Sequence, residues 1–187
     1  MIRMLLFLFG FTLLACNGGT GNATMPGGAE AHENGGNTLA LQTASRAFSN
    51  AGAPDRFRLE LTGDSILLST ATFTITTAAG EEIYRESFPA RMLLDNGFNY
   101  DANPGRAARE AYIRQRVAEF FRDANFRTPA IDESEIFQED QSDKAAWNDI
   151  RSDRSATGFF YQLGEEDGRN IAWSKRQQKV LLYLNCC

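Results

Sequence analysis

Apolar and polar residues alternate in consecutive short runs through the middle of the chain, and this pattern most restricts how it can fold. In the first run, Phe57, Leu59 and Leu61 alternate with charged and polar residues. The runs cover residues 56–62, 66–77 and 83–88. A period of two residues is typical of a strand that buries one face. Because short glycine-containing turns separate the runs, they predict an antiparallel meander.

The period then changes to that of a helix. Apolar residues recur every three or four positions at Ile113, Val117, Phe120, Phe121 and Ala124. This spacing places them on one side of a helix. Asn103 can cap such a helix and Pro104 suits its first position. We therefore expect a helix over residues 104–124 that covers one face of the sheet.

Further strands are expected towards the C-terminus. Apolar residues alternate again over 159–163, 171–173 and 180–184, and in the last run Val180, Leu182 and Leu184 are expected to face inward. Leu39 and Leu41 indicate a short earlier strand, and residues 144–150 a short helix that buries Trp147 and Ile150. The chain is thus predicted to be α+β. We expect a single domain over 38–187 with about six antiparallel strands, as an open sheet or incomplete barrel, and one main helix on a face.

The head of the chain has the organisation of a secretion signal. Arg3 precedes an apolar run from Met4 to Leu14. A run of this length is too short to cross a bilayer, which takes about 20 residues. Residues 1–15 are therefore expected to be a signal peptide.

The signal ends in Leu13-Leu14-Ala15-Cys16, which resembles the lipobox of bacterial lipoproteins, and the chain is similar to small lipoproteins of the Bacteroidota. The resemblance implies cleavage before Cys16 and acylation of that residue with fatty acids such as palmitate. Since Asn17 is not the aspartate that retains lipoproteins in the inner membrane, the resemblance also implies an anchor in the outer membrane. Residues 17–20 lack the acidic cluster of many surface-exported members, which favours a position facing the periplasm. The alternative is an ordinary secretory signal with an incidental cysteine.

Residues 16–37 are expected to be a flexible tether. They are rich in glycine, asparagine, alanine and threonine and contain almost nothing that could fill a core. A chain of this length has a root-mean-square reach of about 25 Å. The only histidine, His32, lies in the tether. A Ser-His-Asp catalytic set is therefore not expected in the folded domain.

The charge of the chain argues against nucleic acid as a partner. The net charge is -5, whereas phosphate binding needs a concentration of lysine and arginine. Acidic residues over 132–143 and 165–167 leave open a carboxylate hydrolase, which needs two carboxyl groups about 5–10 Å apart in a cleft. No metal site or cofactor is predicted, because nothing supplies the four ligands of a zinc site and no phosphate-binding glycine loop occurs.

Cys186 and Cys187 are a candidate redox pair at the end of the chain. An oxidising envelope favours disulfides. The Cα atoms of adjacent residues, however, lie about 3.8 Å apart, short of the usual disulfide span, so a bond between them would be strained. Two thiols, or one thiol paired with another molecule, are equally compatible with the sequence.

A candidate binding patch lies on the last strands. Its aromatic residues and their basic neighbours are Tyr161, Trp173, Tyr183, Arg176 and Lys179. Aromatic side chains with a basic rim are typical of binding surfaces, although aromatic residues in strands are also typical of a core. The sequence favours a non-catalytic, lipid-anchored envelope protein that binds an envelope protein or a small ligand through its single domain. A redox enzyme, a hydrolase and a purely structural component remain the alternatives.

Overall fold

The computed structural model describes residues 36–94, 104–164 and 166–186. Contacts within the chain separate two units, 1–33 and 34–187, and every described residue belongs to the second. The predicted signal peptide, Cys16, His32 and nearly all of the expected tether lie outside the described residues.

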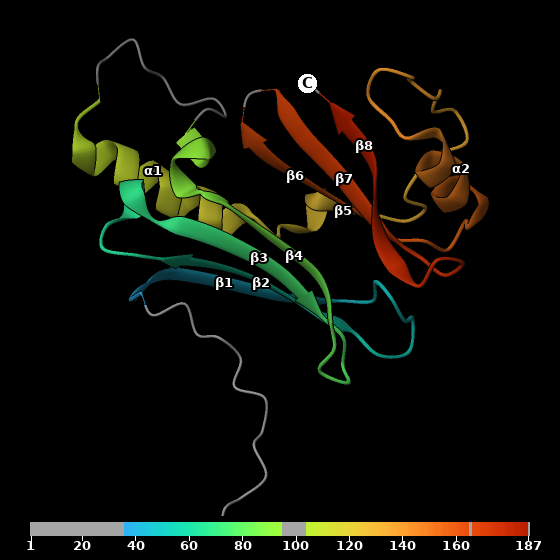
Figure 1. Cartoon of the computed structure of the whole chain (residues 1–187), viewed down its shortest axis with the longest axis horizontal. Coiled ribbons are helices and arrows are strands. Elements are labelled where there is room, and N and C mark those ends of the chain that lie inside the picture. The colour runs from blue at the N-terminus through green and yellow to red at the C-terminus, as the bar shows by residue number, and fades with distance from the viewer. Residues whose placement is uncertain (1–35, 95–103, 165, 187) are drawn as a thin grey trace, which may run out of the picture. The chain divides into compact units, whose positions relative to one another are not determined.

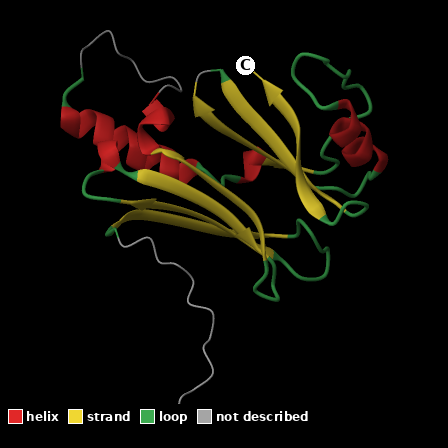
Figure 2. Ribbon diagram, in the orientation of Figure 1, coloured by secondary structure: helices red, strands yellow, loops and turns green. Residues whose placement is uncertain are grey.

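The described residues form two four-stranded antiparallel sheets. Sheet A follows the chain in the order β1-β2-β3-β4 (Figures 1 and 2). Its strands are β1 (Thr38–Arg46), β2 (Asp55–Thr62), β3 (Thr70–Thr76) and β4 (Glu82–Pro89). The predicted meander is confirmed. Its third strand begins later than expected, because residues Ile66–Leu68 form a 3₁₀ turn, η1, before it.

The inner face of sheet A is built from the alternating residues of β2 and β3. Phe57, Leu59, Leu61, Phe73 and Ile75 have no exposed surface, as their spacing predicts.

The first strand differs from the expectation. A bulge between Thr38 and Ala40 shifts the register of β1 against β2, and Leu41 is half exposed. The two leucines of β1 therefore do not share an inward face, because one extra residue changes the side to which later side chains point.

Sheet B is separate, so the prediction of a single sheet of about six strands is wrong. Its order is β5-β6-β7-β8. The strands are β5 (Phe126–Arg127), β6 (Gly158–Gly164), β7 (Asp167–Ser174) and β8 (Lys179–Cys186). Residue periodicity shows which side chains face a core, but it does not show which strands pair. The long segment between β4 and β6 breaks the meander, and the two groups of strands stack instead of joining edge to edge.

Aromatic rings fill the space between the sheets. Phe57 and Phe73 of sheet A meet Phe159 of sheet B with ring centroids 5.4 and 5.6 Å apart, and Phe73 meets Tyr161 at 5.4 Å. Edge-to-face pairs at this spacing are favourable beyond the area that they bury. We call this cluster, with Phe120 and Phe121, the inter-sheet core.

The main helix, α1 (Arg106–Glu119), is shorter than predicted. Gly105, in extended conformation, takes the N-cap position without a side-chain hydrogen bond, and the proposed cap Asn103 lies outside the described residues. The apolar stripe is confirmed through Phe121, whereas Ala124 is exposed on a following 3₁₀ turn, η3 (Asp123–Asn125).

Helix α1 covers only part of sheet A. It contacts β1 and the 3₁₀ turns η1 and η2 (Ala90–Leu94), and Phe120 and Phe121 reach Phe73 (Figure 1). Sheet B covers the rest of the inner face, as the ring contacts show. Helix α1 and sheet B thus cover different parts of one apolar surface, the inner face of sheet A.

The short helix α2 (Lys144–Ser152) is confirmed close to its predicted position, with Trp147 and Ile150 buried. Asp143 caps it by accepting a hydrogen bond from the Ala146 N–H at 2.7 Å. Helix α2 packs on the face of sheet B opposite sheet A (Figure 1). Within the described residues, no helix is long and apolar enough to cross a membrane.

The expected inward set of β8 is wrong. Leu181 and Tyr183 are buried towards α2, Val180 packs on the inter-sheet core, and Leu182 is 42% exposed. The side chains of β8 do alternate, but the face towards α2 is the more buried one, so the buried residues have the opposite parity to the one expected.

A polar network joins the sheets beside the aromatic rings. The Tyr161 hydroxyl donates to Glu86 Oε2 at 2.5 Å and lies 2.7 Å from the Tyr84 hydroxyl. Arg169 pairs with Glu86 and, at 2.8 Å, with Asp167. Burial raises the pKa of both tyrosines, so both remain neutral hydrogen-bonding groups at physiological pH. The network sets how β4 lies against β6 and β7.

We expect Phe73→Ala to destabilise the unit by about 3–5 kcal/mol, because it removes a ring that contacts both sheets and α1. Phe73→Leu, which keeps most of the volume, should cost less. Leu68→Ala is the control, since Leu68 is 81% exposed, and it should change stability by less than about 0.5 kcal/mol. Urea denaturation followed by tryptophan fluorescence measures all three. Equal midpoints for Phe73→Ala and Leu68→Ala would contradict the assigned core.

Candidate binding site

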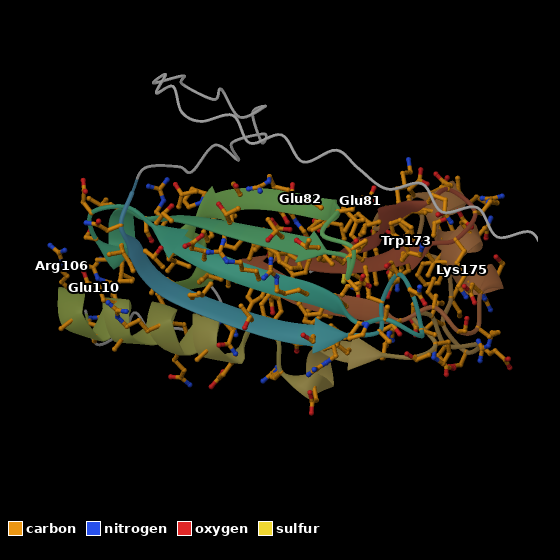
Figure 3. The ribbon with its side chains drawn as sticks, turned by 90° about the horizontal axis from the view of Figure 1, so that it is seen from below. Glu81, Glu82, Arg106, Glu110, Trp173 and Lys175 are labelled. Atoms are coloured by element: carbon orange, nitrogen blue, oxygen red, sulfur yellow. The ribbon has the colours of Figure 1, made fainter. Side chains whose placement is uncertain are left out.

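Connections from both sheets border one shallow depression of about 430 Å³. The connection between β1 and β2 and the turn between β3 and β4 lie at the same end of sheet A, because successive hairpins of a meander alternate ends. The turn between β7 and β8 reaches the same end. Figure 3 shows Glu81, Trp173 and Lys175 close to one another there. The lining residues are Ser49, Asn50, Ala51, Thr77, Glu81, Trp173, Lys175 and Gln178. We call this the Trp173 depression.

Trp173 is the one aromatic residue among the described residues of this lining. It is half-buried on β7 opposite Val180 and packs against the inter-sheet core. Within the described part of the chain, no side chain or backbone group is hydrogen-bonded to its indole N–H. An anchored aromatic ring with an available polar edge is a common element of binding sites.

The first bordering loop is held by a buried carboxylate. Asp55, 1% exposed, accepts hydrogen bonds from Ser49 N at 2.5 Å and from Ser49 Oγ at 2.8 Å. Asn50 Oδ1 accepts from Gly52 N at 2.9 Å. These bonds set the path of the loop and leave the Asn50 NH₂ group facing outward as a donor.

The two other connections are tight turns. Gly80 N donates to Thr77 O at 2.9 Å, and Glu81 N donates to Thr77 Oγ1 at 3.1 Å. Gly80 has φ +89°, a value that favours glycine. In the turn between β7 and β8, Gln178 also has a positive φ of 52°, and its N–H donates to Ser174 O at 2.8 Å. The lining side chains thus project from ordered backbone.

A second depression, of about 290 Å³, lies on the α2 side of Trp173. Asp149 of α2 borders it and is buried. Its carboxylate accepts from Ser174 Oγ at 2.8 Å and Gln177 Nε2 at 2.7 Å, and lies 3.2 Å from Arg176 Nε. Burial opposes ionisation, but the bonds from Gln177, Ser174 and Arg176 prevail and hold the pKa of Asp149 below its ordinary value. Asp149 therefore fastens the turn between β7 and β8 to α2.

The Asp153 carboxylate is likewise bonded to neighbouring side chains. Hydrogen bonds from Ser155 and Lys175 hold its pKa below the ordinary value, and Lys175 Nζ lies 2.9 Å from its carboxylate. The paired carboxylates of a glycoside hydrolase need one partner with a raised pKa that can donate a proton. Asp149 and Asp153 are both held ionised and already accept hydrogen bonds from neighbouring side chains, so neither fits the role of that proton donor.

A raised pKa occurs elsewhere, at Asp167, where burial is the cause. Arg169 lies between Asp167 and Glu86 and pairs with both. The Glu86 carboxylate thereby joins the two sheets, whereas the Asp167 carboxylate pairs with Arg169 within β7. Within the described residues, no group of three or more histidine, cysteine or acidic side chains is arranged to hold a metal ion.

The five residues of the predicted patch do not form one surface. Tyr161 is buried between the sheets. Tyr183 is buried on the opposite face of sheet B, where its hydroxyl donates to Ala130 O at 2.9 Å. Trp173 borders both depressions and Arg176 the one beside α2, while Lys179 is exposed at the start of β8.

The sequence pattern does not reveal the other lining residues of the Trp173 depression, because each lies in a turn that carries no binding motif. The order of strands in the meander does indicate which turns lie close together. Since its hairpins alternate ends, strand order alone places residues 49–51 and 77–81 at one end of sheet A.

The candidate cysteines are only partly placed. Cys186 ends β8 and is half-buried, whereas Cys187 and Cys16 lie outside the described residues. A Cys186–Cys187 redox pair therefore stays a prediction.

No protein family, curated protein or solved structure matches the chain.

Asp149→Asn tests the link between α2 and the turn. Because the folded-state pKa of Asp149 lies below the unfolded value of about 3.9, its ionised form stabilises the fold at neutral pH. That contribution is lost as the pH falls through the folded-state pKa. We expect Asp149→Asn to cost about 1–3 kcal/mol at pH 7 and progressively less below pH 4, measured by urea denaturation across pH. The exposed Asp140→Asn should change stability little at either pH, and a cost for Asp149→Asn that does not vary with pH would refute the assignment.

Proposed function

We propose that this chain is a lipid-anchored protein of the bacterial cell envelope, held by Cys16, most consistent with the periplasmic side of the outer membrane. Its folded unit binds an envelope protein or a small ligand without chemical conversion. The observation that carries the proposal is the Leu13-Leu14-Ala15-Cys16 sequence at the end of an apolar run. Several acyl chains, each gaining about 0.8 kcal/mol per buried CH₂, make a stable anchor, whereas a single chain is marginal.

The segment after Cys16 supports the same function. A glycine-rich stretch leads to Thr38, where β1 begins. A flexible chain of this length lets a folded unit reach partners about 25 Å from the membrane surface. A tether of this kind serves a protein that must meet a partner in the envelope.

The Trp173 depression supports the binding part of the proposal. It combines a half-buried tryptophan with polar side chains from ordered turns of both sheets. The Glu81 carboxylate, which has no bonded partner within the described residues, comes from the turn between β3 and β4, whereas Trp173 lies on β7. The site therefore depends on the packed sheets and not on one flexible loop.

Labelling with radioactive palmitate tests the anchor. The wild-type chain expressed in bacterial cells should incorporate label and fractionate with membranes, and Cys16→Ala should lose both properties. Cys186→Ala is the matched control, because it removes a thiol from the folded unit and should keep the label. Equal incorporation by wild type and Cys16→Ala would exclude lipidation at Cys16.

Photo-crosslinking in intact cells tests binding. A benzoylphenylalanine residue at Glu81, on the rim of the Trp173 depression, should yield specific adducts. The same residue at Thr70 is the control, since Thr70 is exposed on the outer face at the opposite end of sheet A. Identical adduct patterns at the two positions, or none at Glu81, would count against a binding role for the depression.

A further inference from the structure

The Trp173 depression offers an unusual mixture of available hydrogen-bonding groups. Within the described residues, nothing is bonded to the Glu81 carboxylate, to the Asn50 NH₂ group or to the indole N–H of Trp173. Gln178 donates through Nε2 to Lys175 O at 2.7 Å, which leaves its Oε1 as an acceptor. The site thus presents donors and acceptors side by side around one aromatic ring.

The charges of the depression narrow the class of ligand. Lys175 is already paired with Asp153 and donates to Ser155 Oγ at 2.7 Å. The remaining charge of the described lining is the Glu81 carboxylate, which repels anions such as phosphate. A cation would use Glu81 and the face of Trp173 but would leave the Asn50 and indole donors without a partner. A purely apolar ligand would leave every polar group of the site without a hydrogen-bonding partner.

A sugar matches this combination of hydrogen-bonding groups and an aromatic ring. Each hydroxyl both donates and accepts, so it can satisfy an amide NH₂, an amide oxygen and a carboxylate within a small area. The C–H face of a sugar ring is apolar and can lie on an indole ring that is already held by the core. The depression is open and shallow, which suits a short stretch of a chain of sugars better than an enclosed small molecule.

We propose that the Trp173 depression binds neutral sugar residues of a glycan, with Trp173 as the stacking platform and with Asn50, Glu81 and Gln178 as hydrogen-bonding partners. This inference rests on the proposed binding function and names its ligand class. Thr77 Oγ1 accepts a hydrogen bond from Glu81 N, and this bond holds the Thr77 hydroxyl at the same rim. The ligand contacts come from turns of both sheets, so recognition requires the sheets to be packed.

Calorimetric titration of the full chain tests the proposal. The chain is kept in a detergent without sugar groups, and the probes are linear oligosaccharides of N-acetylglucosamine, glucose, mannose and xylose. We expect at least one probe to bind with a dissociation constant between micromolar and millimolar, and Trp173→Ala to weaken it about tenfold or more. Absence of binding by every probe up to about 10 mM would overturn the inference.

Further variants separate the sugar from other ligands. In Asn50→Ser the side-chain oxygen can still accept the hydrogen bond from the Gly52 N–H, but the NH₂ donor is lost. This variant should weaken binding several-fold, and it provides a test even if Trp173→Ala does not fold. Glu81→Gln keeps a hydrogen-bonding group without charge and should change sugar affinity by less than about threefold. Leu68→Ala, on η1 at the other end of sheet A, is the control and should bind normally. Binding of tetramethylammonium that is lost in Glu81→Gln, with no sugar binding, would assign the site to a cation.

The result is distinguishable from failure of the proposed function. If Glu81 crosslinks to a partner in cells while no oligosaccharide binds, the binding function stands and the sugar inference is overturned. If oligosaccharides bind but Cys16 carries no lipid, the anchor fails and the ligand class stands.

Discussion

Stacking of the two sheets through aromatic rings is the interaction on which the rest of the structure depends. Phe57 and Phe73 lie on one sheet, Phe159 and Tyr161 on the other, and each ring is almost or completely buried. Neither sheet could bury its inner face alone, because α1 covers only part of sheet A. A partly buried hydrogen bond between Tyr161 and Glu86 adds a directional contact to apolar packing that is otherwise non-directional.

The candidate site is a consequence of this packing. Asn50 and Glu81 come from turns of sheet A, while Trp173 and Gln178 come from sheet B, and they border one depression because the sheets stack with these turns at one end. Asp149 secures the turn that carries Gln178 by tying it to α2. Core packing and the shape of the depression are therefore coupled, and Trp173 contributes to both.

Much of the secondary structure can be predicted from residue spacing, and the errors have physical causes. The strands around Phe57 and Phe73 are predicted correctly because each buries a single face. Sheet B is covered on both faces, by α2 as well as sheet A, and at β8 the face towards α2 is the more buried one, so the buried residues have the opposite parity to the one predicted. The same double coverage separates Tyr161 from Tyr183, although their spacing suggests one patch.

Residues close together in the chain are enough to predict the alternating strands of sheet A and the apolar stripe of α1, and they contain the lipobox-like sequence Leu13-Leu14-Ala15-Cys16. The stacking of the strands as two sheets, and the meeting of Asn50, Glu81 and Trp173 at one depression, are properties of the tertiary structure. These residues come from separate hairpins. Their proximity follows from which faces bury each other, and that choice is made by the free energy of the whole packed core, which local spacing does not encode.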